Sequence, residues 1–484
     1  MEELDIATVT KRSIRGVFAL VSRTFFIQLI SLAVITLLYA LLKESEIGVF
    51  YLVSASIAFL SYFSDIGLAA ALIQKKEALT DNDLITTFTI QQGLVILVVV
   101  IAFFLSGVVG NIYKLNIEGV HLFQALVFSF FLSSLKTIPS IILERNLRFD
   151  KLVIPQIVET IVFNLVVLVL ALKGYGINSY TYAVLARGLV GLLTIYLIAP
   201  WKIGIGFSKE IAKRLLSFGI PFQSNSVLAL LKDDLLILYL GTVLPFAQLG
   251  YIGFAQKWAY TPLRLIMDNV IRITFPSFSR LSHDMQSLGK AIEKSLFATI
   301  ALIFPALTGL VLLAPYFIYY IPKYQKWEPA FLSLAFFAFN AALSSISTPL
   351  TNALNAIGKV KITLYLMIFW TVATWILTPI SLLLFGFNGV AVASAIISLS
   401  VVGVIYLVKK YVAFNVGSIT IVPASATTIM GIVVYFLSKV LVSNLLMVFV
   451  MIVIGVIIYL GTMFLFGRKQ IIEDTRSIIL NLKK

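Results

Sequence analysis

Charged residues recur along one predicted helix within an otherwise apolar part of this chain. They are Lys257, Arg264, Asp268 and Arg272, spaced seven, four and four residues apart. Because positions four or seven apart share one side of an α-helix, the spacing predicts a single polar stripe. Such a stripe suits the wall of a water-filled cavity, where the cations could hold an anion. The alternative is a ladder of ion pairs that offsets the burial of these charges.

Further charges fall inside predicted membrane spans. Lys232, Asp233 and Asp234 adjoin one another in the span before the stripe. Either aspartate could neutralise a cation of the stripe across the hairpin, or could serve in ion coupling. Arg23 has no acidic neighbour in its own predicted helix, so its partner is either Asp65 in the next span or an anionic ligand.

A second group of polar residues gives weaker cavity candidates. Lys136, Glu159 and Arg187 each lie in a predicted span, where they could reach an interface or pair between helices. Cations outnumber carboxylates inside the predicted spans, which favours an anionic substrate over a cationic drug. Side chains that could contact sugar hydroxyls are Gln91, Gln92, Gln223, Asn225, Gln256 and Tyr260.

The composition requires a lipid environment for these residues. Hydrophobic residues make up 60% of the 484 residues and charged residues only 12%, which is too apolar for one soluble core. Cysteine is absent, and the two histidines, His121 and His283, are not at metal-ligand spacing. We therefore expect no metal and no cofactor.

The apolar segments predict an all-α polytopic membrane protein of about 14 transmembrane helices, given about 20 residues per crossing. The expected spans are 14–41, 47–73, 84–109, 119–142, 153–172, 179–199, 217–240, 249–272, 294–319, 329–354, 360–384, 387–408, 419–438 and 444–466. The net charge is +15, and most of the lysines and arginines lie in every second short loop between these spans, so that they would face one side of the membrane. This asymmetry indicates membrane topology rather than nucleic-acid binding, and predicts a multi-pass cell-membrane protein with both termini cytoplasmic.

Matching anchors suggest a weak internal repeat, a common device in transporters. Lys11-Arg12 corresponds to Lys213-Arg214, and Glu46-Ile47-Gly48 to Gln248-Leu249-Gly250, both at an offset of 202 residues. Pro139 and Lys151 correspond to Pro349 and Lys361 at an offset of 210 residues. We therefore expect an N-terminal lobe at 1–208 with spans 1–6, a C-terminal lobe at 209–412 with spans 7–12, and two additional spans with a basic cytoplasmic tail at 413–484.

Four strings resemble those of the polysaccharide flippases of the Wzx or O-antigen type. This family belongs to the multidrug/oligosaccharidyl-lipid/polysaccharide exporter (MOP) superfamily, with the MATE exporters and lipid II flippases. The strings are Asp65-Ile66-Gly67 through Lys75-Lys76-Glu77, Leu143-Glu144-Arg145-Asn146-Leu147-Arg148-Phe149 after Pro139, Ala171 to Gly176, and the run from Ser217-Phe218-Gly219-Ile220-Pro221 to Ser279. Many members have glutamine at the position of Glu144. The likeness covers about the first 290 residues well and the remainder mainly by topology.

The resemblance implies two six-helix lobes around a central cavity that opens alternately to each side, plus two C-terminal helices. It implies a flippase that carries a polyprenyl-diphosphate-linked oligosaccharide from the cytoplasmic to the outer leaflet, for surface polysaccharide or glycan assembly. The partners would be this lipid-linked oligosaccharide, membrane lipids and polysaccharide assembly enzymes, and we expect a monomer. The expected diphosphate-binding residues are Arg23, Lys232, Lys257 and Arg264.

Other classes stay open at this stage. A MATE-like ion-coupled exporter of small molecules would share the fold and would use carboxylates, for which Asp65, Asp233, Asp234 and Asp268 are available. A membrane enzyme would need a large outer loop or an acidic catalytic cluster, and the loops offer neither. An assembly scaffold would not explain so many charges within the spans. We therefore expect a transporter rather than an enzyme.

Overall fold

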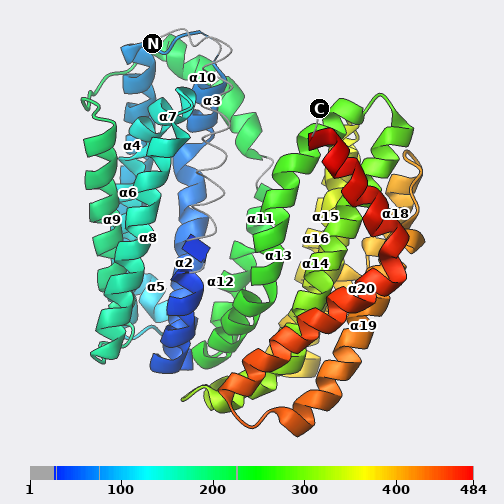
Figure 1. Cartoon of the computed structure of the whole chain (residues 1–484). Coiled ribbons are helices and arrows are strands. Elements are labelled where there is room, and N and C mark those ends of the chain that lie inside the picture. The colour runs from blue at the N-terminus through cyan, green and yellow to red at the C-terminus, as the bar shows by residue number, and fades with distance from the viewer. Residues whose placement is uncertain (1–26, 29, 76, 225–226, 483–484) are drawn as a thin grey trace. The chain divides into compact units, whose positions relative to one another are not determined.

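Helices joined by turns and short loops make up the part of the chain that the structure describes, residues 27–28, 30–75, 77–224 and 227–482 of a computed structural model (Figure 1). An α-helix satisfies its backbone hydrogen bonds internally, which is what a segment surrounded by lipid requires. The all-α prediction is confirmed.

The chain divides into two units, Met1–Gly250 and Tyr251–Lys484. After an apolar helix at Ile30–Leu41, the first unit holds α2 (Glu44–Asp65), α3 (Leu68–Gln74), α4 (Asp81–Phe104), α5 (Ser106–Tyr113), α6 (Ile117–Ser134), α7 (Thr137–Arg145), α8 (Phe149–Leu172), α9 (Asn178–Ile198), α10 (Lys209–Ser224), α11 (Val227–Lys232) and α12 (Asp234–Val243). Within it, α3, α7 and α10 gather at one end (Figure 1).

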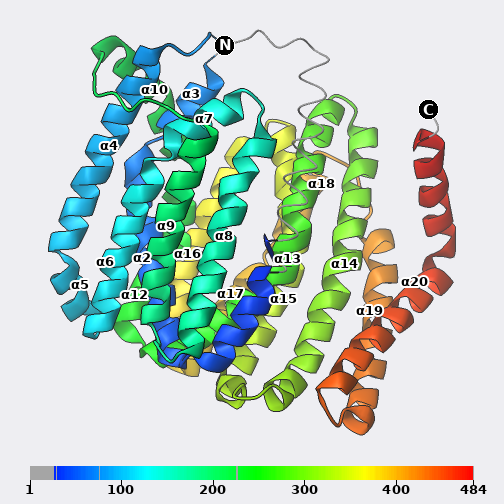
Figure 2. The ribbon, with the colours of Figure 1, turned by 60° about the vertical axis from the view of Figure 1, so that its left-hand side comes forward.

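The second unit begins within α13 (Phe246–Leu281). It continues with α14 (Met285–Tyr320), η1 (Gln325–Ala330), α15 (Phe331–Ala356), α16 (Val360–Phe385), η2 (Gly386–Asn388), α17 (Gly389–Ser398), α18 (Val401–Lys409), α19 (Val416–Leu441) and α20 (Leu445–Leu482). The last two helices form a hairpin packed on α14 (Figure 2). Buried Leu313, Met430 and Val448 belong to the apolar core that these three helices share.

Ten stretches of the described residues are long and apolar enough to cross a membrane. The chain is therefore a multi-pass membrane protein, while the count of fourteen spans stays a prediction. Several predicted spans are divided between two or three helices. The second breaks at Ile66 and Gly67, which both have positive φ, the fourth breaks before Lys136, and the seventh breaks at Asp233.

The division into units differs from the predicted lobe boundary between residues 208 and 209. In the first unit α10 packs against α3 and α4, and α12 packs against α2, and this unit ends at Gly250. The seventh predicted span thus belongs with the preceding helices by packing. The three-part division into lobes and additional spans stays a prediction.

Two glycines that the repeat relates to each other lie in direct contact where α2 and α13 begin. A Cβ added to Gly48 would lie 1.8 Å from the carbonyl oxygen of Phe246. A Cβ added to Gly250 would lie 2.0 Å from the carbonyl oxygen of Glu44. Each glycine therefore faces the carbonyl four residues before the other, a reciprocal approach that only residues without a side chain allow. This symmetry supports the repeat locally.

Candidate functional site

A carboxylate at the centre of unit 1 holds two cations from neighbouring helices. Glu159 of α8 accepts a hydrogen bond from Lys136 Nζ at 2.5 Å, and its other oxygen lies 3.6 Å from Arg187 Nε of α9. The break between α6 and α7 places Lys136 here, immediately before α7. Gly191 provides space, since a Cβ there would lie 2.1 Å from Glu159 Oε1. The three charged residues among the weaker cavity candidates thus form one cluster.

The cluster lies far from either end of its helices. Arg187 is nine residues from the start of α9 and eleven from its end, which at 1.5 Å per residue is about 14 and 17 Å. Glu159 is likewise ten and thirteen residues from the ends of α8. Both α8 and α9 are candidate membrane spans. Pairing between helices, rather than reaching an interface, is therefore how these charges are accommodated.

A cavity of about 440 Å³ adjoins the cluster, and we call it the Glu159 pocket. Its lining residues are Ile27, Lys136, Ser140, Leu152, Pro155, Gln156, Glu159, Thr160, Arg187 and Ile195. The side chain of Arg187 is 53% exposed, whereas that of Glu159 is only 10% exposed. Gln156 Oε1 is buried and has no hydrogen-bond partner among the described residues. The pocket therefore combines an accessible guanidinium with a largely buried carboxylate.

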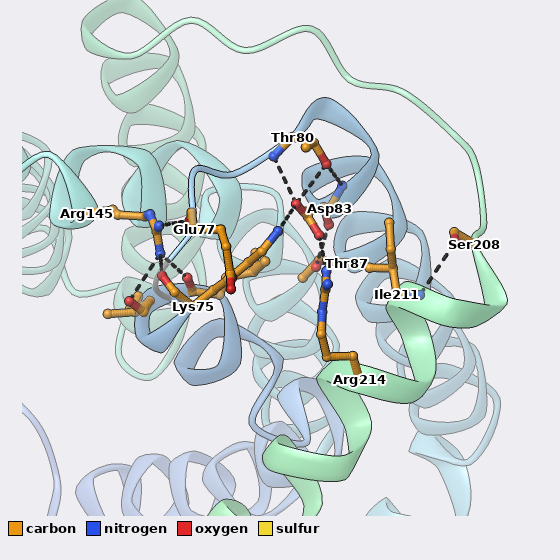
Figure 3. Close-up of polar contacts among 11 residues, drawn as sticks. Lys75, Glu77, Thr80, Asp83, Thr87, Arg145, Ser208, Ile211 and Arg214 are labelled. Carbon is orange, nitrogen blue, oxygen red and sulfur yellow. Dashed lines mark hydrogen bonds and ion pairs between the residues drawn. The ribbon is translucent and has the colours of Figure 1, made fainter. Parts of the chain in front are cut away.

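A second charge cluster surrounds Asp83 at the start of α4 (Figure 3). The carboxylate accepts hydrogen bonds from Lys75 Nζ at 2.6 Å and from Arg214 Nη2 of α10 at 2.7 Å. The backbone N–H and the hydroxyl of Thr80 donate to it as well, at 2.9 and 2.8 Å. Thr80 Oγ1 in turn accepts from the backbone N–H of Asp83, which completes a capping box. The cluster joins α10 to α4 and to the loop after α3.

The same end of unit 1 is fastened by Arg145, the last residue of α7. Its guanidinium donates to the carbonyl oxygens of Leu72, Lys75 and Glu77, around the turn that follows α3 (Figure 3). Carbonyl oxygens at a helix end have no intrahelical partner, so an arginine satisfies them well. Arg145 belongs to the string that resembles the flippase pattern after the fourth span. Its observed contacts hold the backbone rather than a ligand.

The predicted stripe lies on α13 in unit 2. The side chains of Lys257, Arg264 and Asp268 are all exposed on this continuous helix. None of the three forms an ion pair with a described side chain, so the alternative ladder is not seen there. The side chain of Arg272 lies outside the described part. Two exposed cations thus stand about 10 Å apart along the helix axis.

Lys232 and Asp233 lie where the seventh predicted span breaks. The Lys232 ammonium lies 2.9 Å from Asp233 Oδ1, and Asp234 begins α12 as a half-buried side chain. Regular helical neighbours would point about 100° apart, so the break makes this pairing of adjacent residues possible. The Lys232 ammonium therefore has a counter-ion beside it in the sequence.

Some of the remaining predicted site residues lie outside the described part of the chain, and others lie on α13. Arg23 and Asn225 lie outside the described residues, and the side chains of Asp65 and Gln223 do too. Tyr260 donates to Asn340 Oδ1 at 3.2 Å, which ties α13 to α15. Gln256 is half-buried on α13.

Two further polar predictions, Gln91 and Gln92, are buried where α4 meets α6 and α7. Gln91 donates to the hydroxyl of Thr137 at 3.0 Å, and Gln92 accepts from Ser134 at 3.2 Å. Their contacts are between helices. No group of three metal-binding side chains occurs in the described residues.

Sequence reasoning missed the role of Asp83. Lys75, Arg145 and Arg214 entered only as parts of strings or anchors, with no partner assigned. The available signal was Thr80-x-x-Asp83, a capping-box pattern that opens an apolar run. That pattern predicts the helix start, but not the two cations that converge on it from distant parts of the chain.

Comparison with known proteins fits this architecture. Residues 37–331, more than half of the chain, match the family described as "Polysaccharide biosynthesis protein". The chain belongs to this family. The matched region contains both charge clusters of unit 1 and the whole of the α13 stripe, so the polar features described above lie in the part that family members share.

Two curated relatives and one solved structure are similar to this chain over much of their length. WzxC, a lipopolysaccharide biosynthesis protein of Escherichia coli K12, is 24% identical over 71% of this chain and 69% of its own. ExoT, a succinoglycan biosynthesis transport protein of Rhizobium meliloti, is 22% identical over 61% of this chain and 60% of its own. The inward closed structure of the lipid II flippase MurJ superposes with a TM-score of 0.78 at 18% identity, over 95% of this chain and 100% of MurJ.

The fold is shared more widely within the MOP superfamily. An inward-facing MATE multidrug transporter superposes with a TM-score of 0.62 at 17% identity, over 80% of this chain and 96% of its own. The fold is therefore that of the MurJ and MATE transporters, as the resemblance implied.

Proposed function

We propose that this protein is a flippase that translocates a polyprenyl-diphosphate-linked oligosaccharide from the cytoplasmic to the outer leaflet of the cell membrane, for polysaccharide assembly. Membership of the polysaccharide biosynthesis family supports the pathway, and the names of WzxC and ExoT agree with it. A diphosphate and hydrophilic sugars cannot cross hydrocarbon unaided, whereas a polyprenyl tail can stay in lipid.

The observation that carries the proposal is the pair of exposed cations on α13. Lys257 and Arg264 share one side of the helix without a carboxylate partner among the described side chains. Ammonium and guanidinium donors bind phosphate oxygens through charge-assisted hydrogen bonds. We assign the diphosphate to these two residues, with Arg23 and Lys232 as further ligands, and Asp65, Asp233, Asp234 and Asp268 as counter-ions or coupling groups.

The arrangement in the membrane completes the proposal. Two six-helix lobes, 1–208 and 209–412, would surround a central cavity that opens alternately to each side, and 413–484 would add two spans and a cytoplasmic tail. Both termini would be cytoplasmic, in keeping with the basic loops. The protein would act as a monomer beside polysaccharide assembly enzymes. A MATE-like exporter of small molecules shares the fold, but the exposed cations on α13, which have no ion-pair partner among the described side chains, favour an anionic cargo.

Reconstitution of the protein with a fluorescent undecaprenyl-diphosphate-linked oligosaccharide tests this function. We expect Lys257→Ala and Arg264→Ala each to lower the translocation rate about tenfold, the effect of one lost charge-assisted hydrogen bond. Lys290→Ala removes an exposed cation of α14 and serves as the control. Unchanged translocation in both α13 variants would contradict the assignment, and no translocation by the unsubstituted protein would contradict the function.

A further inference from the structure

The Glu159 pocket carries more positive charge than its own carboxylate balances. Lys136 and Arg187 line it with Glu159, which gives a sum of one positive charge. Glu159 holds Lys136 tightly, at 2.5 Å, and Arg187 loosely, at 3.6 Å. Because Glu159 and Arg187 lie near the middle of candidate membrane spans, the uncompensated charge has a strong preference for an anion.

We propose that this pocket binds an acidic sugar of the transported glycan, with Arg187 holding the carboxylate of a uronic acid or a similar single negative charge. The proposal rests on the proposed function and adds the chemistry of the cargo. One such group would bring the pocket to neutrality. The guanidinium suits it because its planar donors match a carboxylate in pairs.

The uncharged groups of the pocket match the rest of a sugar ring. Ser140 and Thr160 line the pocket with hydroxyl groups, and the Glu159 carboxylate has acceptor capacity beyond its hydrogen bond from Lys136. The hydroxyl oxygens and the carboxylate suit sugar hydroxyls, which donate. Ile27, Leu152 and Pro155 add apolar surface for the face of a ring. Donors and acceptors thus occur together with an apolar wall.

The size of the pocket agrees with this cargo. Its volume of about 440 Å³ lies within the range of roughly 300–1,000 Å³ typical of small-molecule sites. It suits one or two sugar units rather than a whole oligosaccharide. The remainder of the glycan would lie outside the pocket.

The diphosphate of the carrier fits this pocket less well. A diphosphate bears at least two negative charges, so it would leave the pocket net negative beside Glu159. The Glu159 carboxylate would also face phosphate oxygens, which accept and do not donate. The exposed cations of α13 have no such carboxylate partner among the described side chains.

Two matched cargoes test the inference in proteoliposomes. They are undecaprenyl-diphosphate trisaccharides that differ only in carrying glucuronate or glucose at one position. We expect Arg187→Gln to lower the ratio of acidic to neutral translocation rates about tenfold, and Arg187→Lys to recover part of it because the charge is kept. Lys173→Gln removes an exposed cation after α8 and should leave the ratio unchanged.

The outcomes separate this inference from the function on which it rests. A ratio unchanged by Arg187→Gln overturns the acidic-sugar site, even if both cargoes are translocated. An equal fall for both cargoes also overturns it, since that result assigns Arg187 to the diphosphate or to the stability of unit 1. Failure of the unsubstituted protein to move either cargo contradicts the flippase function itself. Thermal unfolding of each variant shows whether the fold is kept.

Discussion

Two carboxylates of unit 1 each pair with two cations, and they differ in how closely the second cation is held. Asp83, 1% exposed, accepts from Lys75 and Arg214 at 2.6 and 2.7 Å and from Thr80 twice. Glu159 has one cation at 2.5 Å and the other at 3.6 Å, with a cavity beside them. The first cluster is complete, while the second keeps an arginine available.

This difference separates a structural contact from a binding site made of the same residue types. Asp83 lies at a helix start, where a capping threonine and two cations satisfy its oxygens and connect three segments (Figure 3). Glu159 lies in the middle of a helix, where only side chains from other helices can reach it. A spare cation next to a cavity, rather than a buried charge alone, indicates where a ligand binds.

Removal of the Asp83 carboxylate should have the largest effect on stability. We expect Asp83→Ala to lower the free energy of unfolding by about 3 kcal/mol, because Lys75 loses its counter-ion and α4 loses its capping box. Thermal unfolding in detergent measures it. Arg214→Gln should cost less, since the Arg214 side chain is 54% exposed. Equal stability of Asp83→Ala and the unsubstituted protein would show that the cluster contributes little.

Glu159→Gln should have a smaller effect on stability and a larger one on selectivity. The amide still accepts a hydrogen bond from Lys136, so we expect a loss of about 1–2 kcal/mol. The net charge of the pocket rises from one positive charge to two. This should raise the translocation rate of the acidic trisaccharide relative to that of the neutral one. The two trisaccharides measure that ratio. A fall in the ratio would mean that Glu159 orients Arg187 instead of competing for it.

The smallest expected effect on stability concerns Asp284, an exposed carboxylate in unit 2. Its Oδ1 accepts from the backbone N–H groups of Gln286 and Ser287 at the start of α14. Hydrogen bonds from the hydroxyl and the N–H of Ser287, and then from Gln286, lower the pKa of Asp284 below its usual 3.8. A lowered pKa in the folded state adds stability above pH 3.8 that is lost as the pH falls below it.

Hydrogen exchange of the first turn of α14 checks this effect. Protection should fall slightly between pH 4 and pH 3 in the unsubstituted protein, after correction for intrinsic exchange rates. Asp284→Asn keeps an N-cap acceptor but does not titrate, so its protection should not change over that interval. The same fall in Asp284→Asn would assign the change to another group.

The predictions from sequence succeeded where a local pattern was sufficient. Apolar length predicted the membrane-spanning helices, and the seven- and four-residue spacing predicted that Lys257, Arg264 and Asp268 share an exposed side of one helix. Lys136, Glu159 and Arg187 were named as separate candidates, yet their meeting could not be predicted. They lie 23 and 28 residues apart in the chain, on α8, on α9 and in the turn before α7, and helical spacing says nothing about which faces of different helices meet.

The sequence by itself determined the class of this protein: its apolar content requires a membrane, its spacing puts charges on helix faces, and its strings resemble a flippase family. Tertiary structure alone decided which charges are neutralised. It brought Arg214 to Asp83 across 131 residues, left Arg187 loosely paired beside a cavity, and put Gly48 against Gly250. The reason is physical: the cost of a buried charge depends on its neighbours in space, and packing between helices selects those neighbours.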